Sequence, residues 1–321
     1  MNLLVNRESL QPDEKFCHPE LTAKGEKRAR VDLTNLSTLW FNTGTLCNLS
    51  CLNCYIESTP RNDRLVYLTH SEVLSYLDEI RDANFNTSEI GITGGEPFMN
   101  PDIIPIMESC LERGFELLVL TNAMRPMMKC ANDLLRLSAK YGQQMTLRVS
   151  VDHFKKALHE EERGTNSWKP MMTGLQWLSD NNLSIDIAGR TRWGESEEQL
   201  REGFSEFFRS NGIKIDAFDR KQLVLFPEME LSEDVPEITT ECWEILNVDP
   251  ANMMCASSRM VVKHKGDSKP SVQACTLLAY DQQFNLGSTL AEAQKPVALN
   301  HVFCSKFCVL GGGACSVKDQ D

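Results

Sequence analysis

The residues best suited to chemistry are three cysteines, Cys47, Cys51 and Cys54, which lie within eight residues of one another. A loop of this length can direct three thiolates at one metal centre, but it supplies no fourth. An iron-sulfur cube takes four thiolates, so three would leave one iron open to a substrate or a cofactor. The spacing therefore predicts a metal centre built for reaction, although three-cysteine runs also occur in zinc sites.

Two further features surround this loop. The apolar run Leu39-Trp40-Phe41 precedes it and predicts a buried strand. A second predicted strand, 89–93, ends in Gly94-Gly95-Glu96-Pro97, about one strand-helix unit further along the chain. In this order, the CxxxCxxC loop and the GGEP segment resemble the radical S-adenosylmethionine (radical SAM) superfamily.

The resemblance implies a particular cofactor set and reaction. In that superfamily, three thiolates hold a 4Fe-4S cluster whose open iron is chelated by the amino and carboxylate groups of S-adenosylmethionine. An electron from a donor such as ferredoxin or flavodoxin enters the sulfonium, and the resulting 5'-deoxyadenosyl radical abstracts hydrogen from a substrate. By this resemblance, Cys47, Cys51 and Cys54 are the cluster ligands of this chain.

The same resemblance suggests residues for S-adenosylmethionine. Gly94 and Gly95 permit close approach of the backbone to the methionine part, and Glu96 can accept from its ammonium group. Tyr55 resembles the aromatic residue that adjoins the adenine, whereas Asn53 stands where many members carry an aromatic residue. The remaining candidates are Pro97, Asn122, Ser150, Asp152, Arg163 and Arg190, with a solvated position as an equal alternative for the last three.

The segments around these residues alternate between strand-like and helix-like patterns. Helices are predicted after the capping boxes that begin at Thr69 and Ser196, after Asn100, and over about 127–141 and 168–179. Six strands joined by helices predict an α/β fold, a partial (βα)6 TIM-like barrel, which the family resemblance also implies. The predicted strands are 39–41, 89–93, 115–120, 145–151, 183–188 and 222–226. The candidate residues follow strand ends, where barrels of this kind carry their chemistry.

Cysteines return after about residue 230. A hairpin is predicted over 259–263 and 271–275, with Cys255 before it and Cys275 on its second arm. This arrangement resembles the twitch or SPASM extension of radical SAM proteins, where such a hairpin helps to hold an auxiliary 4Fe-4S cluster. One auxiliary cluster is expected, and the spacing leaves open which four of five thiols bind it: Cys255, Cys275, Cys304, Cys308 and Cys315.

Composition limits the class of protein. The chain has 321 residues, 41% of them hydrophobic and 24% charged, which is typical of a globular protein with a sizeable core. A net charge of -12 argues against a nucleic-acid substrate. The N-terminus does not resemble a signal peptide and no apolar run is long enough for a membrane span, so a cytoplasmic protein is expected. Twelve cysteines in that reducing compartment favour metal or redox chemistry over disulfides.

Three regions are predicted: an N-terminal extension over 1–36, a radical SAM core over 37–230 and a C-terminal, cysteine-rich auxiliary-cluster domain over 231–321. The hypothesis is a radical SAM enzyme that abstracts hydrogen from a peptide or protein side chain or from a small metabolite. The alternative is a non-catalytic iron-sulfur or zinc-binding carrier or scaffold, which would leave the GGEP segment and the polar strand ends unexplained.

Overall fold

The computed structural model describes residues 14–228 and 234–312. Its central sheet has eight strands in the order β7-β6-β5-β4-β3-β2-β8-β9. All neighbours are parallel except β9, which runs antiparallel to β8. The strands are β2 (Thr38–Asn42), β3 (Glu89–Thr93), β4 (Glu116–Thr121), β5 (Met145–Ser150), β6 (Ser184–Arg190), β7 (Leu223–Phe226), β8 (Ser258–Val262) and β9 (Ser271–Gln273). The predicted partial barrel of six parallel strands corresponds to β2 to β7.

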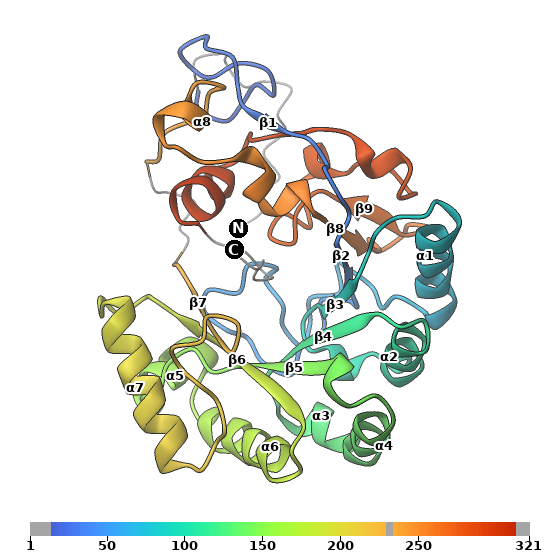
Figure 1. Ribbon diagram of the computed structural model, residues 1–321, viewed down its shortest axis with the longest axis vertical. Coiled ribbons are helices and arrows are strands. Elements are labelled where there is room, and N and C mark those ends of the chain that lie inside the picture. Colours follow the sequence, from blue (N-terminus) through green and yellow to red (C-terminus); the bar gives the residue numbers. More distant parts are fainter. Residues whose placement is uncertain (1–13, 229–233, 313–321) are drawn as a thin grey trace.

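The larger helices lie on the outer side of the curved sheet (Figure 1). They are α1 (His70–Asp82), α2 (Ile103–Glu112), α3 (Arg125–Lys129), α4 (Ala131–Tyr141), α5 (Lys156–Arg163), α6 (Trp168–Asp180) and α7 (Glu197–Ser210). The capping boxes predicted at Thr69 and Ser196 are both present, at the starts of α1 and α7. Each satisfies two backbone groups that the first turn of a helix leaves without partners. None of the helices within the described residues is long and apolar enough to span a membrane.

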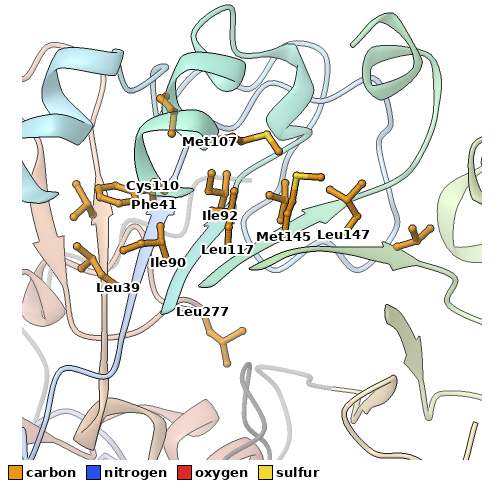
Figure 2. Packing of buried hydrophobic residues seen from close by; sticks show 14 of the residues in the cluster. Leu39, Phe41, Ile90, Ile92, Met107, Cys110, Leu117, Met145, Leu147 and Leu277 are labelled. Atoms are coloured by element: carbon orange, nitrogen blue, oxygen red, sulfur yellow. The ribbon is translucent and has the colours of Figure 1, made fainter. Parts of the chain in front are cut away.

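The core lies between the strands and these helices. Met107 and Cys110 of α2 pack over Phe41 and Ile92, and all four side chains are fully buried. Figure 2 shows this layer on one side of the strands, with Leu277 on the other side. Because both faces of the parallel strands are covered, their sequences are nearly continuous apolar runs.

Two details of the helices differ from the sequence-based prediction. The single helix predicted over 127–141 is wrong: α3 and α4 are separate, with a break at Cys130 and an earlier start beside Pro126. The helix α5 was not predicted. Its buried side chains are His159 and Glu162, so its inner face is polar and leaves no apolar period in the sequence.

The C-terminal region continues the same sheet. The predicted hairpin is present as β8 and β9, and β8 pairs in parallel with β2, the first strand of the core. The strand β1 (Arg30–Val31) pairs with β10 (Val297–Ala298), so the N-terminal segment lies against the C-terminal region. The remaining helical elements are η2 (Pro97–Met99), η3 (Gly142–Gln144), α8 (Cys242–Ile245), η4 (Pro250–Asn252), η5 (Met254–Ala256), η6 (Gln282–Phe284), η7 (Glu292–Gln294) and the π-helix η8 (Cys304–Leu310).

Candidate active site

One cavity lies at the carboxyl ends of the parallel strands. Its wall includes residues from the loop after β2 and from the ends of β3, β4, β5, β6 and β7. Most of the predicted site residues line it: Cys47, Cys51, Cys54, Tyr55, Gly94, Gly95, Asn122, Ser150, Asp152, Arg163 and Arg190. Glu96 and Pro97 do not line the cavity and are buried beneath it. Residues far apart in the sequence are therefore brought together at one end of the sheet.

The three thiols of the loop are partly or fully shielded from water. Burial raises the pKa of Cys47 to about 12 and also raises the pKa of Cys51. Backbone N–H groups donate to two of the sulfurs, from Leu49 to Cys47 at 3.4 Å and from Ser58 to Cys54 at 3.3 Å. A desolvated thiolate with such donors is stabilised when a cation is bound beside it. Three thiols around one cavity thus fit a cluster that accepts three protein ligands.

The glycines of the GGEP segment allow β3 to meet the chain that enters the cysteine loop. Gly94 has φ +147, and a Cβ atom there would lie 2.6 Å from the carbonyl oxygen of Gly44. A Cβ atom at Gly95 would lie 2.3 Å from the carbonyl oxygen of Leu46. Instead, the Gly95 N–H donates to the carbonyl of Gly44 at 2.8 Å. Any larger side chain would push the loop away from the sheet.

Glu96 faces the end of β4. It is 2% exposed, and its carboxylate accepts from the Thr121 hydroxyl at 2.8 Å and from the Asn122 N–H at 2.9 Å. Burial raises the pKa of Glu96 to about 7 despite these hydrogen bonds. The Asn122 side chain donates in turn to the Asn48 side chain of the cysteine loop at 2.9 Å. Glu96 therefore connects the GGEP segment to the loop through Asn122.

A buried ion network lies on the other side of the loop. Arg163 donates to Asp152 through Nε at 2.6 Å and through a second nitrogen at 3.2 Å, and Arg190 lies 3.4 Å from the same carboxylate. Burial opposes the ionisation of Asp152, but the two guanidinium groups hold its pKa below the usual value. Arg190 also donates to the carbonyl of Asn53 and lies over the Tyr55 ring at 5.0 Å. The solvated alternative for Asp152, Arg163 and Arg190 is wrong, because all three side chains are at most 12% exposed.

Glu162 is a site residue that the sequence analysis missed. It is 1% exposed, and its carboxylate accepts from the Asn53 backbone N–H at 2.8 Å and from the Asn53 side chain at 3.0 Å. Arg192 donates to it at 2.7 Å, and the Glu162 carbonyl accepts from the N–H of Leu52. This side chain fixes the cysteine loop from α5. The available signal was Asn53 itself, because it stands where the family resemblance implies an aromatic residue and a partly buried loop amide takes polar partners.

A second cavity lies in the C-terminal region. Four of the five candidate thiols line it, those of Cys255, Cys275, Cys304 and Cys308. The rest of its wall is largely apolar. They come from η5, from the end of the hairpin and from one side of the π-helix η8. Burial raises the pKa of Cys304 well above its usual value, and nearby Cys275 and Cys255 add to this rise. Cys315 lies outside the described residues.

These four thiols are a donor set suited to an iron-sulfur cube, which takes four thiolates. The described part of the chain contains no group of three or more His, Cys, Asp or Glu side chains placed to hold a single metal ion. Leu277 lines both this cavity and the one at the strand ends, and its N–H donates to the Cys275 sulfur at 3.4 Å. The two sites are thus separated by the short segment 275–277.

Comparisons with known proteins agree with this geometry. Residues 41–192, from the end of β2 to just beyond β6, match the family model of the radical SAM superfamily. This chain therefore contains a radical SAM domain. Its relatives include the antilisterial bacteriocin subtilosin biosynthesis protein AlbA of Bacillus subtilis, 22% identical over 92% of this chain and 66% of AlbA. Another is the GTP 3',8-cyclase of Pasteurella multocida, 25% identical over 41% of this chain and 37% of that protein.

Solved structures with bound S-adenosylmethionine share the fold. Streptococcus suis SuiB bound to S-adenosylmethionine aligns with a TM-score of 0.58 and 15% identity, over 79% of this chain and 63% of SuiB. The enzyme anSMEcpe with bound S-adenosylmethionine aligns with a TM-score of 0.54 and 12% identity, over 84% of this chain and 80% of that chain. The present chain spans slightly less than two thirds of AlbA and of SuiB.

Replacing Glu162 by Ala should loosen the cysteine loop of the radical SAM domain. The substitution leaves the Asn53 N–H and Arg192 without their buried acceptor, and breaking a buried ion pair costs about 3–5 kcal/mol. We expect a loss of that order in the free energy of unfolding of the metal-free protein, with faster alkylation of Cys51 and Cys54. The control is Glu161→Ala, because Glu161 is 47% exposed and lies 3.6 Å from the same Arg192. Equal effects of the two substitutions would contradict the role of Glu162.

The pKa of Glu96 predicts a pH dependence of stability. Because its folded value of about 7 is above the ordinary value of 4.5, its contribution is present in full below about pH 4.5 and is lost as the pH rises through 7. Gln at this position cannot titrate. Between pH 4.5 and 7.5, wild type should lose about 3 kcal/mol of unfolding free energy relative to Glu96→Gln. Urea unfolding of both metal-free proteins measures this difference. If the unfolding free energies of the two proteins change in parallel with pH, the Glu96 carboxyl is ionised throughout this range and the prediction is wrong.

Proposed function

We propose that this chain cleaves S-adenosylmethionine reductively at a 4Fe-4S cluster held by Cys47, Cys51 and Cys54. When bound, the cluster and the cofactor would supply the 5'-deoxyadenosyl radical that abstracts hydrogen. The observation that carries the proposal is the single cavity that contains these three thiols and the strand-end residues of a radical SAM domain. A carrier or scaffold would have no use for the polar strand ends around that cavity.

The residues around the thiols suit the binding of a zwitterionic cofactor. Glu96 is a buried carboxyl group with no cation in direct contact among the described residues, so a ligand ammonium near the end of β3 would favour its ionised form. Gly94, Gly95 and Asn122 present backbone and amide groups at the same edge. We propose Tyr55 for contact with the adenine ring, because Tyr55 lines the cavity under the Arg190 guanidinium. Ser150, Asp152, Arg163 and Pro97 complete the proposed cofactor site.

The second cavity is the proposed site of an auxiliary 4Fe-4S cluster. We propose Cys255, Cys275, Cys304 and Cys308 as its ligands, with Cys315 as the competing fifth thiol. Cys275 lines this cavity, Thr276 lines the proposed radical site, and Leu277 contributes to both walls. An electron from a substrate radical would therefore have a short path to the auxiliary cluster. This proximity favours an oxidative modification of the substrate.

A peptide is the proposed substrate. AlbA is named as a protein of bacteriocin biosynthesis, and its similarity extends over 92% of this chain, beyond the radical SAM core. SuiB has been solved with its precursor peptide SuiA. The similarity to GTP 3',8-cyclase covers only 41% of this chain. A small metabolite remains the alternative substrate.

We propose ferredoxin or flavodoxin as the electron donor, and the cytoplasm as the compartment that keeps the twelve cysteines reduced. Leu52, between two of the cluster thiols, is 66% exposed, so the cysteine loop reaches the surface where a donor can approach. The proposed functional regions are 1–36, 37–230 and 231–321, the last sharing the sheet with the core through β8.

The first test is cofactor cleavage. Anaerobically reconstituted and reduced protein should convert S-adenosylmethionine to 5'-deoxyadenosine, measured by liquid chromatography. Cys47→Ala, Cys51→Ala and Cys54→Ala should each abolish this, because two thiolates cannot retain a cube that already has an open iron. Cys130→Ala is the matched control, since Cys130 lines neither cavity. No product from fully iron-loaded wild type, or retained cleavage in all three variants, would refute the proposal.

Iron content tests the auxiliary cluster. Wild type should hold about eight irons per chain, and a Cys255→Ala, Cys275→Ala double variant about four, because one cluster remains. The same double variant should still cleave S-adenosylmethionine without substrate. If wild type holds only about four irons, or the double variant loses none, the four thiols of the second cavity have a structural role or bind zinc.

A further inference from the structure

Arg259 is a buried cation beside the proposed auxiliary site. It lies on β8, opposite Leu39 of β2, and is 1% exposed. Four carbonyl oxygens accept from its guanidinium group: those of Cys255 at 2.5 Å, Ser258 at 2.8 Å, Ala293 at 2.9 Å and Lys295 at 3.3 Å. Arg259 therefore ties η5, which carries Cys255, to the turn that leads into β10.

The charge of Arg259 is not matched by a carboxylate within the described residues. The other buried arginines of the described residues each have one: Arg28 with Glu237, Arg148 with Asp186, Arg190 with Asp152 and Arg201 with Glu197. Carbonyl dipoles satisfy the N–H groups of Arg259, but they do not neutralise a full positive charge. A buried charge left in this state is costly unless an anion lies nearby.

The nearby anions would be thiolates. Burial lowers the pKa of Arg259 to about 10, and the Cys255 and Cys275 side chains oppose this effect, so both sulfurs lie within electrostatic reach of the guanidinium. A second guanidinium, that of Arg28, acts on Cys304, but it is already paired with Glu237 at 2.5 Å. Arg259 does not line the cavity, but it contacts the backbone of Cys255, which does, and it has no carboxylate partner among the described residues.

We propose that Arg259 is the counter-charge of the auxiliary 4Fe-4S cluster, an inference that rests on the proposed function of the second cavity. Four thiolates give such a cluster a net negative charge, and reduction makes it more negative by one. A fixed cation in a region of low dielectric stabilises the reduced state more than the oxidised state. Arg259 is accordingly a positioning residue that raises the reduction potential and lets the auxiliary cluster accept an electron more readily.

The test uses the full chain with Cys47, Cys51 and Cys54 all replaced by Ala, so that only the auxiliary cluster contributes a signal. In this background we compare Arg259 with Arg259→Met, which removes the charge, and Arg259→Lys, which keeps the charge but not the four-way hydrogen bonding. Iron content and the midpoint potential, from a redox titration followed by electron paramagnetic resonance at pH 7, are the readouts. The control is Arg201→Met, a buried arginine on α7 that donates to Glu197, Ala217 and Leu223 and to none of the four thiol-bearing residues.

Arg259→Met should shift the midpoint potential to a lower value. Arg259→Lys should keep it close to that of the parent protein, and Arg201→Met should leave it unchanged. An unchanged potential in a fully loaded Arg259→Met protein overturns the inference. A lower potential in both Arg259 variants also overturns it, because the hydrogen bonding rather than the charge would then matter. If Arg259→Met loses its iron, full loading of Arg259→Lys supports the role of charge and loss in both variants refutes it. If the triple Ala parent protein with Arg259 unchanged holds no iron, there is no auxiliary cluster, and both that proposal and the present inference are refuted.

Discussion

A buried network of guanidinium and carboxylate groups fixes the cysteine loop over the ends of the strands. Asp152 binds Arg163 and Arg190, and Glu162 binds Arg192 and the backbone of Asn53. Charges at this depth are stable only as complete sets, since each loses its hydration shell. The network therefore gives the loop one preferred shape, and three sulfurs on a loop of fixed shape can meet one cluster without a large loss of conformational entropy on binding.

Much of this architecture could be predicted from sequence because its signals are local. Strands covered on both faces appear as apolar runs, the capping boxes at Thr69 and Ser196 lie within four residues, and the polar strand ends follow directly after those runs. The family motif then assigned the cysteine loop and the GGEP segment to one site. Eleven of the thirteen residues predicted for that site line its cavity, and the other two lie beneath it.

The parts that could not be predicted depend on contacts between distant residues. Asn53 and Glu162 are 109 positions apart, and nothing in either local sequence indicates the other. The helix α5 was missed because polar groups bound to the loop occupy its inner face, where an apolar stripe would ordinarily lie. Likewise, a β-branched, apolar run predicts that β8 is a strand, but its partner is chosen by the tertiary structure. The carbonyl partners of Arg259 follow from the same long-range packing.

The parallel pairing of β8 with β2 affects how the chain must be made and handled. The strand β2 has a neighbour on each side, β3 from the core and β8 from the C-terminal region. A fragment that stops before residue 230 would leave β2 as an exposed edge, with the buried residues Leu39, Trp40 and Phe41 beside unpaired backbone groups. Such an edge is a template for intermolecular association. During synthesis, β2 ends at Asn42 and its partner β8 begins only at Ser258, so this edge of the core stays open while about two thirds of the chain is made.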